Sequence, residues 1–464
     1  MPGQSAIVTI DSFYARRLNN ERRILVYLPP GYEERTSKRY PVLYMHAGQR
    51  AFEPAKPGTE SWNIHKAADR LIEEGIIEEI IIVAIAHVRP VTSNEYYHFV
   101  APAAEAKHIA CTGLDYEHFI IRDLKPYIDR RFRTLPGPAN TGLIGSSAGG
   151  LSTYHIGFRN PDVFGKLIML SPYFVKAWLD ENGEAKLGEE TLYRPYTDKL
   201  PLKLWFDIGD AEGLFLPRHV RGVVDRLVAA GYRYGEDIGY LLKPDAAHQE
   251  ADWGERVHIP LIFMFGKTPG RVAAVELLGR DSAALKGMKT QINAVARYDN
   301  GLELSVLNGD YRVQDPEVLE VLPDGTVKPK REGETAVTLT VDGVEATRTY
   351  RVVNELSEFV NVAMSVEVPP ESAPAESIYG GMGMKLMRDG DGRYAGRFLV
   401  PRDTGYRFRF TRGFRRFETA ADGSALPNRA FRAAEDLVLH YKVERWEEKA
   451  VDSPERRSHA DQTF

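Results

Sequence analysis

The segment from Thr141 to Thr153, TGLIGSSAGGLST, most constrains what this chain can fold into. Its apolar start indicates a short buried strand, which runs directly into the pattern Gly145-x-Ser147-x-Gly149. Small residues two before and two after a serine are needed where a strand turns sharply into a helix and exposes that serine. The segment therefore predicts a nucleophilic Ser147, the alternative being a glycine-rich helix start without chemistry.

The same turn predicts half of an oxyanion hole. Free backbone N–H groups at a helix start point toward the reacting oxygen, so the N–H of Ala148 is the first expected donor. The second should come from the loop after the strand at 41–46, where we predict the N–H of Gln49. The further pocket candidates in this loop are His46, which could equally be a strand end, Gly48, which lets the backbone approach the substrate, and Arg50.

A serine nucleophile needs a base, and the base needs an orienting carboxylate. Both should follow later strands, in the order serine, acid, histidine. After the strand at 202–208 the acid candidates are Asp207, Asp210 and Glu212. Asp207 lies within the strand, so the choice is between the two loop residues. We favour Glu212 and keep Asp210 as the alternative acid.

The histidine is expected after the strand that ends near residue 242. Two histidines are available there, His248 and His258. His258 lies in the apolar run at 254–265 and suits the face of a helix. His248 lies in a short loop of small residues, KPDAAHQEADW, and is the predicted base.

Strands and helices alternate over the first 268 residues, which predicts an α/β class with a doubly wound, mostly parallel sheet. Apolar runs buried on both faces are typical of such strands. Ligands bind at the carboxyl ends of these strands, where the serine turn lies. The predicted strands are 6–11, 23–28, 41–46, 79–87, a short strand that runs through Leu143 and Ile144 into Gly145, 166–170, 202–208 and 239–242. The predicted helices are 62–74, 115–132 and 218–230.

The pattern changes after about residue 270. Helix signals fade after Ala296, and short strands separated by DG and EG turns dominate from there. We predict four segments: an α/β enzyme domain at 1–268, a small β-sandwich at 269–355, a second β-sandwich at 356–447 and a polar, disordered tail at 448–464. The strands expected in the β region are 302–307, 317–321, 326–328, 335–341, 346–353, 394–400 and 406–411.

Composition excludes several classes of function. The net charge of −5 gives no reason to expect a nucleic-acid partner, and a single cysteine, Cys111, excludes an internal disulfide. No metal-ligand spacing or phosphate-binding loop is visible, so neither a metal nor a cofactor is expected. The N-terminus lacks the pattern of a signal peptide and no apolar run reaches membrane-span length, so we expect no membrane partner and a cytoplasmic location.

Residues 20–265 resemble the putative-esterase family of α/β-hydrolases, which includes feruloyl and acetyl-xylan esterases and enterochelin-esterase-like proteins. The resemblance implies a Ser147–Glu212–His248 triad. One departure puts the oxyanion pocket in doubt, because many relatives read HDGQN where this chain has HAGQR at 46–50. The matching stretches are YPVLYMHAGQ, ESWNIHKAADRLIEEG, HFIIRDLKPYIDRRFRT, TGLIGSSAGGLSTY, PDVFGKLIMLSP, LWFDIGDAEG and AAHQEADW.

The C-terminal segments resemble accessory domains. LPDGTVKPKREGETAVTLTV, within 315–353, looks like a bacterial Ig-like domain, and 360–446 resembles starch-binding carbohydrate modules. The tryptophan expected in such modules is missing near 379–387. Tyr379, Tyr394 and Trp446 could stack on sugar rings, although packing in the core is the favoured interpretation for each. These modules are usual outside cells, in tension with the cytoplasmic expectation.

Together these patterns predict a serine esterase that acts on small or medium acyl esters through an acyl-enzyme. The alternatives are a polysaccharide-directed acetyl or feruloyl esterase, a siderophore lactone esterase, and a glycan-binding or scaffold protein with an inactive hydrolase fold. The expected partner is a small-molecule or glycan-linked ester. The β domains could also mediate homo-oligomer formation.

Overall fold

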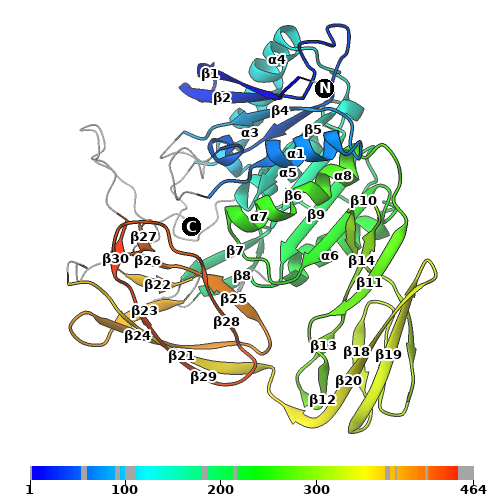
Figure 1. The fold of residues 1–464 in the computed structure, drawn as a ribbon, viewed down its shortest axis with the longest axis vertical. Helices are drawn as coiled ribbons and strands as arrows, with labels where there is room; N and C mark the ends of the chain where they lie inside the picture. The colour runs from blue at the N-terminus through cyan, green and yellow to red at the C-terminus, as the bar shows by residue number, and fades with distance from the viewer. Residues whose placement is uncertain are drawn as a thin grey trace.

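The computed structural model describes residues 3–447 except 54–59, 89–94, 100–109, 180–184, 213–216, 371, 373–376, 382–383 and 413–415. The tail predicted to be disordered, at 448–464, lies outside the described residues. Figure 1 shows three units along the chain: an α/β unit (residues 3–266), a central β unit (272–356) and a C-terminal β unit (359–446).

An eight-stranded sheet forms the α/β unit, in the order β1-β2-β4-β3-β5-β6-β9-β10. The first two strands pair antiparallel, and the strands from β4 to β10 run parallel. This confirms the predicted mostly parallel sheet. The strands are β1 (Ala6–Ala15), β2 (Asn20–Leu28), β3 (Val42–Met45), β4 (Ile81–Ile85), β5 (Thr141–Ser146), β6 (Lys166–Leu170), β9 (Lys203–Gly209) and β10 (Ile238–Lys243).

Helices cover both faces of this sheet, so alternate residues of each strand enter two separate apolar cores. One core lies under α3 (Gly113–His118), α4 (Lys125–Arg131), α5 (Ala148–Arg159) and α6 (Pro217–Ala229). The other lies under α1 (Ile64–Glu73), α7 (Glu250–Arg256) and α8 (His258–Phe265). The α/β-hydrolase class expected from the sequence is therefore correct.

The predicted helix at 115–132 is not a uniform α-helix. A π-helical segment, η3 (Phe119–Leu124), separates α3 from α4. Short 3-10 turns lie at η1 (Gly48–Arg50) and η4 (Pro138–Asn140). An additional antiparallel hairpin, β7 (Val175–Leu179) and β8 (Ala185–Thr191), follows β6 and was not predicted.

The first strand of the central β unit, β11, begins at Val272, well before Ala296, where the helix pattern in the sequence ends. Residues 272–298 contain the four strands β11–β14, inside the β-sandwich predicted at 269–355, although strand signals were expected to dominate only from about Ala296. The later strands agree with prediction. The strands are β11 (Val272–Leu278), β12 (Ser282–Gly287), β13 (Thr290–Gln291), β14 (Asn293–Tyr298), β15 (Glu303–Ser305), β16 (Asp310–Val313), β17 (Leu319–Val321), β18 (Thr326–Pro329), β19 (Gly333–Val341) and β20 (Val344–Leu356).

This unit is fused to the α/β unit through a shared core. Val295 and Leu304 pack in the same apolar cluster as Trp205 and Leu241 of the large sheet. The hydroxyl of Ser305 accepts a hydrogen bond from the backbone N–H of Leu242 at 2.9 Å. The sheet β11-β14-β15 therefore packs directly against the β10 edge.

The C-terminal β unit has its own core beneath an eight-stranded sheet and a two-stranded ribbon, β25-β28. Tyr379, Tyr394 and Trp446 are at most 6% exposed, so these rings pack in that core and offer no face to a sugar. The strands are β21 (Phe359–Glu367), β22 (Ile378–Gly380), β23 (Lys385–Arg388), β24 (Arg393–Pro401), β25 (Gly405–Phe408), β26 (Phe410–Arg412), β27 (Arg416–Thr419), β28 (Arg429–Arg432), β29 (Leu437–Lys442) and β30 (Arg445–Trp446).

Candidate active site

Ser147 occupies the turn between β5 and α5, with φ 53° and ψ −123°. A positive φ is unfavourable for a residue with a side chain and persists only where surrounding contacts hold it. Two backbone hydrogen bonds do so here. The Ser147 N–H donates to the carbonyl of Leu170 at 3.0 Å, and its carbonyl accepts from Tyr173 at 3.1 Å. The serine is thus held at the sheet edge, with Ala148 as the first helical residue.

The turn has no room for a side chain at Gly145 and little at Gly149, where an added Cβ would lie 3.3 Å from His46. A Cβ added to Gly145 would lie 2.5 Å from the backbone of Gly149 and 2.9 Å from the ring of His46. His46 itself is 2% exposed, and its Nδ1 lies 2.9 Å from the hydroxyl of Tyr116. Burial lowers the pKa of His46 to about 3, so its ring is neutral. This side chain supports the turn from inside the core.

His248 and Glu212 lie together. Nδ1 of His248 is 2.8 Å from Oε2 of Glu212, the histidine side chain is 12% exposed, and the carboxylate is fully buried. Each residue lies on the loop after its strand, β10 for the histidine and β9 for the glutamate. A buried carboxylate at this distance fixes the orientation of the imidazole and leaves Nε2 to act as the base.

Hydrogen bonds stabilise the ionised form of Glu212. Its Oε1 accepts from the N–H of Gly209 at 2.8 Å and from the hydroxyl of Ser171 at 2.5 Å. Burial alone would raise the pKa of the Glu212 carboxyl. The charge and hydrogen bond of His248, with Arg256 and Ser171, outweigh burial and hold that pKa below its usual range.

Ser171 is a residue that sequence reasoning missed. Its hydroxyl receives hydrogen bonds from Trp253 Nε1 at 2.9 Å and from Arg256 Nη2 at 2.8 Å, and donates to Glu212. It follows β6 directly, with φ 44°. The only sequence signal was its place at the end of an apolar strand beside the serine strand, which does not distinguish it from other strand ends.

The two other acid candidates have different partners. Asp207 is buried between Trp205 Nε1, at 2.9 Å, and Arg256 Nε, at 2.9 Å. Asp210 accepts a hydrogen bond from the backbone N–H of Asp245 at 2.6 Å, and burial raises its pKa to about 6. The carboxylate in contact with His248 is therefore that of Glu212.

The loop proposed to complete the oxyanion hole is the 3-10 turn η1, which follows β3. A Cβ on Gly48 would lie 2.4 Å from the backbone of Ala84, so only glycine fits against β4. The side-chain amide of Gln49 donates to Nδ1 of His87 at 2.6 Å. This contact fixes the side chain of Gln49, whose backbone N–H is the proposed second donor.

Arg50 joins the same loop to the histidine side of the site. Its Nη1 lies 3.0 Å from Oε1 of Glu250, at the start of α7. The neighbouring Ala47, with φ 52°, donates its N–H to the hydroxyl of Tyr96 at 3.0 Å. Arg50 thus connects two loops at the rim of the site, a contact that spacing in the sequence did not indicate.

All these loops lie at one edge of the sheet, because β3, β5, β9 and β10 run parallel and each ends where a candidate residue begins. His258 instead begins helix α8, in agreement with the helical interpretation. Among the described residues, no group of three histidine, cysteine, aspartate or glutamate side chains is arranged to hold a metal ion. No helix within the described part of the chain is long and apolar enough to cross a membrane.

A serine on a strained strand–helix turn, with an acid–histidine pair at the same sheet edge, defines an enzyme of the α/β-hydrolase class. Residues 15–228, which make up most of the α/β unit, match the family model described as putative esterase.

Known proteins also match part of this chain. An uncharacterized protein of Bacillus subtilis, YjcH, is 26% identical over 180 residues, which cover 39% of this chain and 68% of that protein. An endo-1,4-beta-xylanase/feruloyl esterase of Xylanibacter ruminicola is 27% identical over 250 residues, covering 52% of this chain. The matched region spans only 29% of that longer protein.

Similar solved structures include a ferulic acid esterase, with a TM-score of 0.44 and 21% identity, over 57% of this chain and 98% of that one. The enterobactin esterase of Shigella flexneri has a TM-score of 0.40 and 15% identity, over 57% of this chain and 61% of that one.

Proposed function

We propose that this protein is a serine carboxylic-ester hydrolase that uses Ser147, His248 and Glu212 as its triad and acts on small to medium acyl esters. The observation that carries the proposal is the 2.8 Å contact between Glu212 and His248, at the sheet edge where Ser147 occupies its strained turn. This pairing supports general-base activation of a hydroxyl that is otherwise a weak nucleophile.

In the first half-reaction, Ser147 Oγ attacks the ester carbonyl while its proton passes to Nε2 of His248. The negative charge on the carbonyl oxygen is bound by the backbone N–H groups of Ala148 and Gln49. The C–O bond then breaks, and the imidazolium gives its proton to the departing alkoxide. The buried carboxylate of Glu212 stabilises the imidazolium while it exists.

In the second half-reaction, His248 takes a proton from water, which attacks the acyl-enzyme. The second tetrahedral intermediate collapses, Ser147 recovers its proton from His248, and the carboxylic acid leaves. Each step uses side chains and backbone amides of this chain.

A feruloyl ester is the second substrate class to test, because one relative carries the name feruloyl esterase. A role for the C-terminal β unit in bringing the enzyme to polysaccharide has less support. The three aromatic residues considered for sugar stacking, Tyr379, Tyr394 and Trp446, are buried in its core. We therefore expect recognition of the ester itself to reside in the α/β unit.

The test compares p-nitrophenyl esters from acetate to decanoate, and methyl ferulate, with wild type and Ser147→Ala. The proposal expects hydrolysis by wild type that peaks at short chains and is lost in the variant. Labelling by a fluorophosphonate should modify wild type and spare Ser147→Ala. A wild type that neither hydrolyses the esters nor reacts with the fluorophosphonate would favour the non-catalytic binding alternative.

A further inference from the structure

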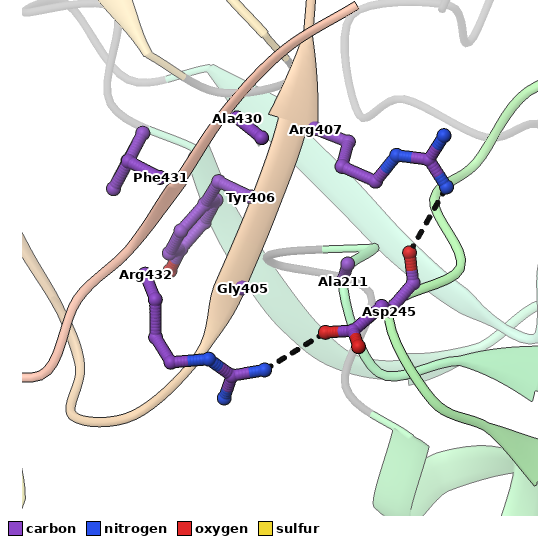
Figure 2. A pocket seen from close by; sticks show the side chains of 8 residues that line it. All are labelled: Ala211, Asp245, Gly405, Tyr406, Arg407, Ala430, Phe431 and Arg432. Atoms are coloured by element: carbon purple, nitrogen blue, oxygen red, sulfur yellow. Dashed lines mark hydrogen bonds and ion pairs between the residues drawn. The ribbon is translucent and has the colours of Figure 1, made fainter.

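Two strands of the C-terminal β unit, β25 and β28, reach across to the loop that carries His248 (Figure 2). From β25, Nη1 of Arg407 lies 2.6 Å from Oδ1 of Asp252 and donates to the backbone carbonyl of Asp245 at 3.2 Å. These two partners stand seven residues apart and lie on either side of the histidine. One guanidinium thus spans the loop.

In the ion pair between Arg407 and Asp252, the carboxylate is buried. The Asp252 side chain is 1% exposed and that of Arg407 is 33% exposed. The other carboxylate oxygen of Asp252 accepts from the side chain of Gln249, the residue after the histidine. A buried carboxylate that loses its cationic partner is strongly destabilised, so the position of Asp252 at the start of α7 depends on Arg407.

The loop of the triad acid also lies at this junction. A pocket of about 320 Å³ lies between the two units beside these contacts. Ala211, which precedes Glu212, lines this pocket together with Asp245. The N–H of Ala211 donates to Ala246 at 3.0 Å, so the acid and histidine loops are bonded to each other. The residues lining the cavity from the C-terminal unit are Gly405, Tyr406, Arg407, Ala430, Phe431 and Arg432.

A second arginine, Arg432, lies 2.8 Å from Oδ1 of Asp245 (Figure 2). Both of these side chains are at least half exposed, at 50% and 70%. Exposed ion pairs contribute little because water and salt screen them. Of these two arginines, Arg407 therefore makes the stronger contact with the loop.

We propose that Arg407 is a positioning residue for His248, so that the C-terminal β unit holds the catalytic loop in its working geometry. This inference rests on the proposed triad. In the native chain, the ribbon β25-β28 serves as an intramolecular clamp on the active site. Misplacing a base by an ångström is enough to slow the chemical step strongly without weakening substrate binding.

The test compares Arg407→Ala and Arg407→Lys in the full chain. The matched control is Arg35→Ala, which removes a cation from Glu79, an 11% exposed carboxylate that precedes β4 and so lies at the opposite end of the strands from the site. We measure kcat and KM for p-nitrophenyl acetate and amide hydrogen exchange over residues 244–252, well below the unfolding transition of each variant. Arg407→Ala should lower kcat about 10- to 100-fold, leave KM within about twofold and speed exchange in this loop.

Arg407→Lys keeps the positive charge but loses the planar guanidinium that contacts both partners, so its kcat should fall less than that of Arg407→Ala. The control Arg35→Ala should change neither kcat nor exchange in the loop. If Arg407→Ala folds poorly, the pair Arg407→Gln with Asp252→Asn removes both charges together and should still slow kcat.

Two results would overturn the inference: equal effects of Arg407→Ala and Arg35→Ala, or unchanged kcat and loop exchange in Arg407→Ala. Failure of the proposed function gives a different result. Wild type and Ser147→Ala would then be equally inactive, while the hydrogen-exchange comparison still shows whether Arg407 holds the loop.

Discussion

Oε2 of Glu212 lies 2.8 Å from Nδ1 of His248, and the opposite oxygen of the same carboxylate accepts bonds from Gly209 and Ser171. Both oxygens of this buried group are therefore engaged, one by the histidine and one by the scaffold. A carboxylate fixed in this way holds one tautomer and one ring orientation of the histidine.

Replacing this carboxylate by an amide tests its role. In Glu212→Gln, the side chain keeps its size but loses the charge that stabilises the imidazolium. We expect kcat for p-nitrophenyl acetate to fall by about 100- to 10,000-fold, with a much smaller change in KM. The control is Asp210→Asn, which keeps an acceptor for Asp245 N–H and should stay within about threefold of wild type. The reverse order of effects would make Asp210 the triad acid.

Removing the hydroxyl of Ser171 should affect both activity and stability. Ser171→Ala leaves Trp253 Nε1 without its acceptor and takes one hydrogen bond from Glu212. An unsatisfied buried polar group costs about 1–3 kcal/mol, so we expect a loss of that size in the free energy of unfolding. We also expect kcat to fall about tenfold, since the carboxylate is held less firmly. Urea unfolding and steady-state kinetics check the two effects, and unchanged kcat would limit Ser171 to a structural role.

The parts of the fold that sequence predicted well are those with strong local signals. The continuous apolar run at 79–87 is long enough to indicate a buried strand, so β4 was correctly located. The pattern Gly145-x-Ser147-x-Gly149 indicates a tight turn for steric reasons, and the turn lies there. The strands at 272–298 were missed. In β14 the residues 294–296 are all buried, because one face packs in the core of the central β unit and the other in the core shared with the α/β unit.

Partners brought together over long distances could not be predicted. Ser171 meets Arg256 across 85 residues, and Arg407 meets Asp252 across 155. A lone serine or arginine in sequence has no periodic signal that indicates such a contact. The ordering rule of serine, acid and histidine narrowed the acid to two loop residues. Only the packing of β9 against β10 decides which one faces His248.

Buried histidines should make the protein sensitive to acid. His155 on α5 is fully buried beside the ring of His98, and burial, reinforced by His98, Arg159 and Arg194, lowers its pKa to about 3. As pH falls, His155 takes up a proton in the unfolded chain before it does so in the folded chain. The free energy of unfolding therefore decreases as pH drops below about 6.5. By pH 5 this histidine alone costs about 2 kcal/mol.

His155→Leu removes that titration at similar volume. Between pH 7.5 and pH 5, its free energy of unfolding should fall about 2 kcal/mol less than that of wild type, measured by urea unfolding at each pH. The control is His440→Gln, since solvent reaches His440 in the folded chain. Equal pH slopes for His155→Leu and wild type would contradict the prediction, whatever the absolute stability of the variant.

A pair of glycine substitutions tests the steric demand at the serine turn. A Cβ on Gly145 would lie 2.5 Å from the backbone of Gly149, whereas a Cβ on Gly137 meets nothing within 4 Å. Gly137 has φ −71° and ψ 156°, which alanine adopts without strain. Gly145→Ala must move the turn, so we expect activity to be lost and Tm to fall.

Gly137→Ala should instead gain about 0.4–1 kcal/mol, because alanine restricts the unfolded chain. Thermal unfolding and fluorophosphonate labelling of Ser147 in both variants provide the comparison. Each variant adds one methyl group to a glycine, at Gly137 before η4 and at Gly145 near the end of β5. The difference in Tm and labelling between the two variants therefore reports on the space around Ser147. A Gly145→Ala protein that is labelled at the wild-type rate would show that the turn can shift without displacing the nucleophile, and the steric argument would fail.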